Sequence, residues 1–383
     1  MRKICAVLVP LALLLTLVPR ASAVELDVGG KSALLMDAAT GTILYEKNAH
    51  EKLSPASVTK VMTLLLIMEA IDSGKIGWED MVTASEAAAA KGGSQIYLKV
   101  GETMSVSDMV KSIAVSSAND CACAMAEHLC GSEGAFVDAM NTRAKELGMH
   151  DTNFVNCTGL DDGTEAQNHK TSAHDIALMS RELLVSHPGI KKFTTIWMDT
   201  VRGGAFGLSN TNKLIRFYSG ATGLKTGFTS GAGYCLSATA ERDGMELIAV
   251  VMGCETSQIR TAACKAMLDY GFANYAVIAP EMGGEAAVPV RLGTAESISL
   301  VPGENPRLLI DKALKSGVTT EITLEPEVAA PVASGQQLGT LTVRSGEQIL
   351  AQVPLVASAE VPRLNWGQLL VLVLQEMAMA ESR

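Results

Sequence analysis

The sequence has few charged and few aromatic residues. Only 19% of its 383 residues are charged and 4% are aromatic, and no long run carries charge of one sign. Together with a hydrophobic content of 48%, this composition excludes a disordered chain and indicates a folded protein. The net charge of −10, without a local basic patch, argues against nucleic acid as a partner, because phosphates would repel the chain. The length predicts two or three domains.

Paired cysteine motifs are also lacking. Cys5 lies in a segment that we expect to be removed, and the remaining seven cysteines are an odd number that cannot all form disulfides. Most of them lie in apolar segments, where cysteine packs as a small hydrophobic residue, so we expect free thiols. Cys121 and Cys123 form a C-x-C motif without the second pair or the spaced histidines of a zinc site. The sequence therefore predicts no metal and no cofactor.

The N-terminus has the pattern of an export signal. Arg2 and Lys3 precede an apolar stretch over residues 4–18, and Ala21-Ser22-Ala23 is a small-residue cleavage site. An uncleaved membrane anchor is the alternative, but the apolar stretch is short for crossing a bilayer. We expect residues 1–23 to be a signal peptide and the mature protein to act at the outer face of the cytoplasmic membrane, in an extracytoplasmic or periplasmic location.

Residues 24–278 have the pattern of an α/β domain in which helices flank an antiparallel sheet. Ser105 and Asp108 form a capping pair at the start of one expected helix. Short connections between the strands near residue 230 imply adjacent antiparallel strands. We expect strands at 32–37, 42–46, 224–229, 234–240 and 246–252, and helices at 58–71, 83–91, 105–115, 120–130 and 256–270.

Two smaller regions follow this domain. Residues 279–360 contain short apolar runs separated by turn residues, which predicts a small all-β domain serving as a spacer or a binding module. Residues 361–383 predict an amphipathic helix at the membrane surface; a core-packing or dimer helix would show a similar stripe, and the segment lacks an excess of lysine. Its apolar face comprises Trp366, Leu369, Leu370, Val373, Leu374 and Met377.

Three short motifs occur once each and in a fixed order. They are Ser57-Val58-Thr59-Lys60, Ser117-Ala118-Asn119 and Lys225-Thr226-Gly227. An S-x-x-K pattern alone arises often by chance, whereas the ordered set of three is specific. Together they can build a serine acyl-transfer site without a histidine.

The first motif supplies a nucleophile and a base. Ser57 and Lys60 lie one helical turn apart at the start of an apolar helix, so both side chains face the same way. Lys60 can accept a proton only when it is neutral, and both burial and a neighbouring cation such as Lys225 disfavour its charged form. Standing alone, the pair could equally be a helix cap and a solvated lysine.

The second motif lies in a tight connection between two expected helices. Ser117 could relay a proton to a leaving amine, and Asn119 offers both a donor and an acceptor to a substrate amide. An ordinary polar turn is the alternative.

The third motif lies on an expected edge strand. Lys225 and Thr226 can bind a terminal carboxylate, and Gly227 permits close approach of an extended peptide. The backbone N–H groups of Ser57 and Phe228 would then form the oxyanion hole. A solvated lysine before a turn glycine is the alternative.

With these three motifs the chain resembles the low-molecular-mass penicillin-binding proteins, which are serine-type D-alanyl-D-alanine carboxypeptidases. The resemblance implies removal of the terminal D-alanine from peptidoglycan pentapeptides through an acyl-enzyme on Ser57, with Lys60 as base and β-lactams as covalent inhibitors. It also implies an α/β catalytic domain, a β-rich second domain and a C-terminal amphipathic anchor. Further similar segments are Leu44-Tyr45-Glu46-Lys47-Asn48-Ala49, Phe154-Val155-Asn156, Gly159-Leu160, and Ala330-Pro331-Val332 with Gly335-Gln336.

Two positions depart from the family pattern. Phe228 stands where some relatives carry a polar residue, and Glu246 lies in a stretch where some carry arginine.

Two other functions stay open. A β-lactamase would share the three motifs, but no E-x-x-L-N sequence follows Ser117. A catalytically silent peptidoglycan-binding protein is the other alternative.

Overall fold

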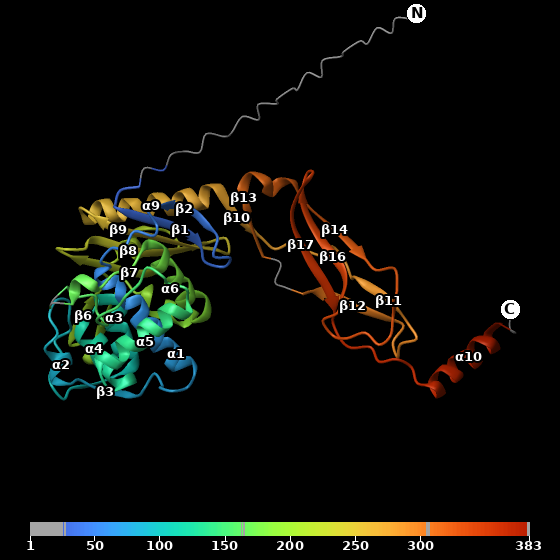
Figure 1. The fold of residues 1–383 in the computed structure, drawn as a ribbon, viewed down its shortest axis with the longest axis horizontal. Coiled ribbons are helices and arrows are strands. Elements are labelled where there is room, and N and C mark those ends of the chain that lie inside the picture. The colour runs from blue at the N-terminus through green and yellow to red at the C-terminus, as the bar shows by residue number, and fades with distance from the viewer. Residues whose placement is uncertain (1–25, 27, 162, 164, 304–306, 381–383) are drawn as a thin grey trace, which may run out of the picture.

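The computed structural model describes residues 26, 28–161, 163, 165–303 and 307–380. The chain forms an α/β domain, a smaller β domain beside it and a C-terminal helix that extends away from both (Figure 1). This architecture confirms the predicted fold class. The predicted signal peptide, residues 1–23, lies outside the described residues.

A five-stranded antiparallel sheet forms the centre of the α/β domain. Its strand order is β2-β1-β9-β8-β7, so β7, which carries the third motif, is an edge strand as predicted. The expected hairpin at residues 32–46 and the three later strands are all present. The strands are β1 (Ser32–Asp37), β2 (Ile43–Lys47), β7 (Ala221–Thr229), β8 (Gly233–Arg242) and β9 (Met245–Cys254).

Helices cover both faces of this sheet (Figure 1). Alternate residues of β1 point to opposite faces: Leu34 and Met36 join the larger core, and Ala33 and Leu35 join the core beneath a single long helix. That helix is α9 (Ser257–Asn274). The larger core includes residues of α1 (Lys60–Asp72), α3 (Val106–Ser116), α4 (Asn119–Cys130), α5 (Glu133–Glu146) and α6 (Ala173–Ser186).

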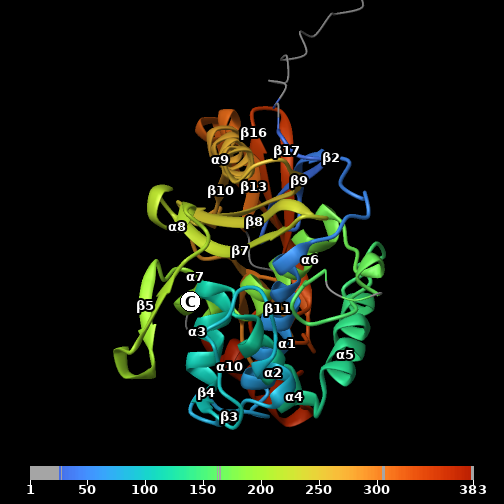
Figure 2. The ribbon, with the colours of Figure 1, turned by 90° about the vertical axis from the view of Figure 1, so that its left-hand side faces the viewer.

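Short elements complete the α/β domain. Figure 2 shows the hairpin of β5 and β6 standing out from the helices. These elements are β3 (Met81–Thr83), α2 (Glu86–Ala89), β4 (Thr103–Ser105), α7 (Lys191–Thr194), β5 (Met198–Val201), β6 (Phe206–Ser209) and α8 (Leu214–Phe217).

The helix expected at residues 83–91 is shorter than predicted. Only Glu86–Ala89 is helical, because β3 pairs with β4 and the backbone of Ala84 bonds to Gly101 and Glu102. Ser85 then caps the short helix by accepting a hydrogen bond from the Ala88 N–H. The tertiary strand pairing thus overrides the helix propensity of the alanine run.

The second domain is all-β, as predicted. Its six-stranded sheet has the order β14-β16-β17-β12-β11-β15 around a separate apolar core. A two-stranded ribbon of β10 (Tyr275–Ile278) and β13 (Leu308–Asp311) lies where the two domains meet. The six strands are β11 (Ala287–Arg291), β12 (Ser297–Pro302), β14 (Val318–Leu324), β15 (Val328–Ala329), β16 (Gln337–Ser345) and β17 (Gln348–Ala357).

Helix α10 (Trp366–Ala380) ends the described chain. Several of its described apolar side chains are exposed: Trp366 retains 87% of its accessible surface and Leu370 retains 61%. No helix in the described part of the chain is both long and apolar enough to cross a membrane.

Candidate active site

Ser57 and Lys60 are joined by a hydrogen bond. Ser57 lies in a short 3₁₀ turn, Ala56–Thr59, which leads directly into α1. The Lys60 Nζ donates to Ser57 Oγ at 3.0 Å and to the carbonyl oxygen of Thr158 at 2.8 Å. Because Lys60 is fully buried while Ser57 is partly exposed, the lysine approaches the serine from inside the protein. The geometry is that of a nucleophile with an adjacent base.

Burial changes the acid–base properties of both motif lysines. It lowers the pKa of Lys60 to about 7, against a weaker opposing effect of nearby groups that include the Asp120 carboxylate. Burial also lowers the pKa of Lys225 well below its usual range, and the charge of Lys60 lowers it further. The two ammonium groups therefore titrate as an interacting pair, and a neutral lysine beside Ser57 is accessible near neutral pH.

The second motif contains two buried side-chain oxygen atoms that have no hydrogen-bond partner in the described structure. Ser117 ends α3 in the left-handed conformation (φ 63°), and Asn119 begins α4. The Asn119 side chain donates to the carbonyl of Gly92 at 2.7 Å, which fixes the orientation of its amide. Among the residues described, Ser117 Oγ and Asn119 Oδ1 are buried without a hydrogen-bond partner. Such atoms cost free energy unless a ligand satisfies them.

The third motif lies against the nucleophile turn. A Cβ added to Gly227 would lie 2.5 Å from the carbonyl oxygen of Pro55 and 3.1 Å from the backbone nitrogen of Ser57. Only glycine permits this approach. Lys225 is 1% exposed, and its Nζ donates to the carbonyl of Thr226 at 3.1 Å. The first and third motifs are thus in direct proximity.

Thr211 connects the second and third motifs, and the sequence patterns did not identify it. Its Oγ1 lies 2.6 Å from Thr226 Oγ1, and its backbone N–H donates to the carbonyl of Val115 at 3.2 Å. Val115 precedes Ser117 by two residues at the end of α3. Thr211 was missed because a single threonine in a loop gives no local signal.

The sequence patterns did not identify Arg260 on α9 either, because a single arginine in a helix gives no local signal of a distant contact. It is 9% exposed, and its Nη1 donates to the carbonyls of Gly227 (3.3 Å) and Cys235 (3.4 Å). It places a second buried cation behind β7, close to the third motif.

The two departures from the family pattern lie in different places. Phe228 is 52% exposed beside the third motif, and its ring stacks on Tyr234 with the ring centres 4.2 Å apart. On β9 the residue in line with Lys225 across the sheet is Val250, and Glu246 lies four residues before it. Its carboxylate binds Lys191 at 2.7 Å and accepts from Thr222 at 2.9 Å. Glu246 therefore acts in a local ion pair at the far end of the sheet.

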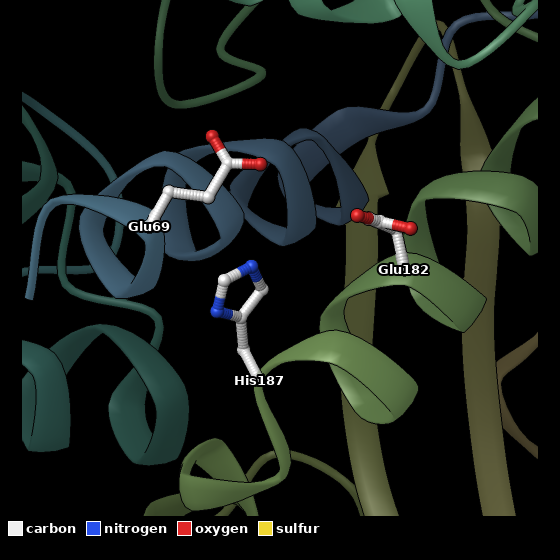
Figure 3. Close-up of side chains that lie close together, drawn as sticks. All are labelled: Glu69, Glu182 and His187. Atoms are coloured by element: carbon white, nitrogen blue, oxygen red, sulfur yellow. The ribbon is translucent and has the colours of Figure 1, made fainter. Parts of the chain in front are cut away.

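One cluster of side chains in the described residues has the spacing of a metal site. Glu69 on α1, Glu182 on α6 and His187 just after α6 point toward one another (Figure 3). However, Arg143 donates to Glu69 at 2.7 Å and to Glu182 at 2.8 Å, and His187 lies 2.5 Å from Asp72. The two glutamates are already paired with a cation, so the cluster is an ion-pair network that ties α5 to α1 and α6. The seven cysteines from Cys121 to Cys264 are free thiols, as predicted.

Two family models match successive parts of the chain. Residues 19–256 match the family described as D-alanyl-D-alanine carboxypeptidase, and residues 282–363 match the one described as penicillin-binding protein 5, C-terminal domain. The chain is 42% identical to D-alanyl-D-alanine carboxypeptidase DacF of Bacillus subtilis over 379 residues, which covers 96% of each chain.

Solved structures give the same result. The structure of penicillin binding protein 5 from Haemophilus influenzae has a TM-score of 0.74 at 32% identity and covers 88% of this chain and 98% of its own. The ampicillin-bound penicillin-binding protein D2 from Listeria monocytogenes has a TM-score of 0.59 at 32% identity and covers 65% of this chain and 99% of its own. The resemblance inferred from the three motifs is thereby confirmed, and the chain belongs to the family of serine D-alanyl-D-alanine carboxypeptidases and carries the C-terminal domain of penicillin-binding protein 5.

Proposed function

We propose that this chain removes the terminal D-alanine from peptidoglycan stem peptides that end in D-Ala-D-Ala, through an acyl-enzyme on Ser57. The observation that carries the assignment is the 3.0 Å hydrogen bond from a fully buried Lys60 to Ser57. The lowered pKa of Lys60 makes it a base that can work near pH 7.

In the acylation step, Ser57 Oγ attacks the carbonyl carbon of the penultimate D-alanine and Lys60 takes the hydroxyl proton. The backbone N–H groups of Ser57 and Phe228 stabilise the negative oxygen that forms. The peptide bond then breaks, and the leaving amine of D-alanine receives a proton by way of Ser117. Water hydrolyses the Ser57 ester in a second step, releasing the shortened peptide and restoring the hydroxyl.

Substrate binding uses the other polar groups of the site. Asn119 Oδ1, which is buried without a partner in the described structure, accepts an N–H of the substrate backbone. Lys225 and Thr226 bind the terminal carboxylate, and the charge of Arg260 behind β7 increases the local positive potential. The space beside the Gly227 Cα is filled by the nucleophile turn, since an added Cβ would lie 2.5 Å from the Pro55 carbonyl oxygen, so this glycine serves the approach of β7 to Ser57 rather than the approach of a peptide.

The direct test is release of D-alanine from a pentapeptide ending in D-Ala-D-Ala. We expect the wild-type protein to release one D-alanine per peptide and Ser57→Ala to release none. Equal release by both proteins, or none by the wild type, would refute the assignment.

A fluorescent penicillin separates this function from the two alternatives. An active serine forms a stable covalent adduct, as expected from the likeness to the ampicillin-bound Listeria protein. A silent peptidoglycan-binding protein would not be labelled, and a β-lactamase would lose its label rapidly by hydrolysis.

Membrane association through α10 is a separate part of the proposal. The exposed apolar side chains of Trp366, Leu370 and Leu374 support it. In this arrangement residues 1–23 direct export, residues 24–278 catalyse, residues 279–360 form the β-rich domain, and residues 361–383 contact the outer face of the membrane. Deletion after Val361 should move the protein from the membrane to the soluble fraction. An unchanged distribution would contradict this role, and loss of a dimer would identify α10 as a dimer helix instead.

A further inference from the structure

A buried histidine outside the three motifs is hydrogen-bonded to the nucleophile motif. His169 precedes α6 and is 3% exposed. Its Nδ1 accepts a hydrogen bond from the backbone N–H of Val155 at 3.1 Å, and its Nε2 lies 2.7 Å from Thr59 Oγ1. Burial lowers the pKa of His169 to about 4, and the charges of Lys170 and Lys60 act in the same direction, so the ring is neutral under ordinary conditions.

The hydrogen-bond partners determine the direction of each bond. Since Nδ1 is an acceptor in a neutral ring, Nε2 carries the proton and donates it to Thr59 Oγ1. The Thr59 hydroxyl has one proton, which it donates to the carbonyl oxygen of Ala56 at 2.8 Å. The result is a continuous chain of donors from His169 through Thr59 to the Ala56 carbonyl.

This carbonyl belongs to the same peptide unit as the Ser57 N–H. The unit is planar and trans, so its C=O and N–H point in opposite directions, and holding one fixes the other. A Cβ added to Gly159 would lie 1.8 Å from the Ala56 oxygen, and one added to Gly227 would lie 3.1 Å from the Ser57 nitrogen. The peptide unit is therefore enclosed between two glycines, with its carbonyl on the side of Thr59.

The backbone at this point needs external support. Ala56 has a φ of 49°, in the left-handed region that a residue with a Cβ seldom adopts. Such a conformation persists only where surrounding contacts hold it. The bond from Thr59 to the Ala56 carbonyl is a contact of this kind.

We propose that His169 and Thr59 are positioning residues, which hold the Ala56–Ser57 peptide unit so that the Ser57 N–H faces the oxygen of the substrate carbonyl. This inference rests on the proposed acylation of Ser57. Neither side chain needs to touch the substrate. Their contribution is to the orientation of one oxyanion-hole donor, which acts only as negative charge develops on the oxygen.

Two pairs of variants test the donor chain. His169→Gln keeps an N–H near the position of Nε2, whereas His169→Asn keeps only an acceptor near the position of Nδ1, for Val155. Thr59→Ser keeps the hydroxyl, whereas Thr59→Val removes it at similar volume. The readouts are the rate constant for acylation by a fluorescent penicillin, kcat and KM for D-alanine release, and the melting temperature.

We expect His169→Asn and Thr59→Val to lower the acylation rate constant and kcat by about 10- to 100-fold with little change in KM. His169→Gln and Thr59→Ser should stay within about threefold of wild type, and the His169→Asn/Thr59→Val double variant should be no slower than Thr59→Val alone. If a histidine variant does not fold, the two threonine variants decide.

Three results would overturn the inference alone, with a normally acylated wild type. The first is a Thr59→Val variant that is acylated at the wild-type rate. The second is a His169→Gln variant that is acylated more slowly than His169→Asn. The third is a double variant whose loss of acylation rate is the product of the two single losses. A histidine that only anchors the Val155 backbone would produce the second of these. A wild type that penicillin does not acylate would overturn the proposed function and this inference with it.

Discussion

The acylation of Ser57 should depend on pH through the protonation of Lys60. A lysine with the ordinary pKa of 10.5 is neutral in only about three molecules in ten thousand at pH 7. Burial lowers the pKa of Lys60 to about 7, so about half of the molecules hold the free base at that pH. The gain in reactive enzyme is therefore about a thousandfold.

This magnitude predicts the shape of the pH profile. The fraction of neutral Lys60 rises from about one tenth at pH 6 to about nine tenths at pH 8, so the acylation rate constant should rise about tenfold over this interval and then level off. Stopped-flow measurement of penicillin binding between pH 5 and 9.5 gives the profile directly. The ring of His169, with a pKa of about 4, does not titrate in this range.

A suitable control is Lys60→Arg, which keeps the positive charge but stays protonated throughout the range. We expect its acylation to be slower by about a thousandfold at pH 8, without a step near pH 7. A wild-type rate that still rises tenfold per pH unit at pH 9 would show that burial does not lower the pKa of Lys60. A rate that is independent of pH would show that Lys60 is not the base.

Three further predictions concern stability and the geometry of the active site. Gly227→Ala should slow acylation by at least about a hundredfold because its Cβ would lie 2.5 Å from the Pro55 carbonyl, whereas Gly231→Ala, whose nearest contact is 3.6 Å, should acylate like the wild type. Asn156→Ala should slow acylation by about tenfold, and a wild-type rate would contradict this. The Asn156 side chain accepts hydrogen bonds from the Gly159 N–H at 2.7 Å and the Thr158 N–H at 3.1 Å, and so holds the Thr158 carbonyl that binds Lys60. The pKa of Lys60 in the folded protein is below its unfolded value of 10.5, so the unfolded state binds more protons between pH 7 and 10.5. Burying this lysine therefore costs about 5 kcal/mol of stability at most at pH 7, and this cost is lost as the pH rises to 10.5. Lys60→Met should accordingly raise the free energy of unfolding at pH 7 by about 1–4 kcal/mol in urea denaturation, and a less stable variant would contradict the argument.

The sequence predicted those features of the site that local patterns determine. Short β-compatible runs joined by short turns predicted the adjacent antiparallel strands β7, β8 and β9, and the Ser105 cap marked the start of α3. The three motifs were placed correctly at a helix start, an inter-helix turn and a strand edge for the same reason. The burial of Lys60 followed from the apolar helix that it begins.

Contacts between distant segments were not predictable in this way. Thr211, Arg260 and His169 each reach the site from a different loop or helix, and a single residue carries no periodic signal. The helix expected at residues 83–91 is limited to Glu86–Ala89, because β3 pairs with β4 on its N-terminal side and the Ala84 backbone bonds to Gly101 and Glu102. Tertiary contacts thus decided the cases that local propensity could not.

The most direct test of the central claim is the position of the covalent β-lactam adduct. The protein is incubated with penicillin, digested, and the modified peptide is identified by mass spectrometry. The account predicts one adduct per chain, on the peptide that contains Ser57, and none in Ser57→Ala. An adduct on Ser117, or an adduct that persists in Ser57→Ala, would contradict it.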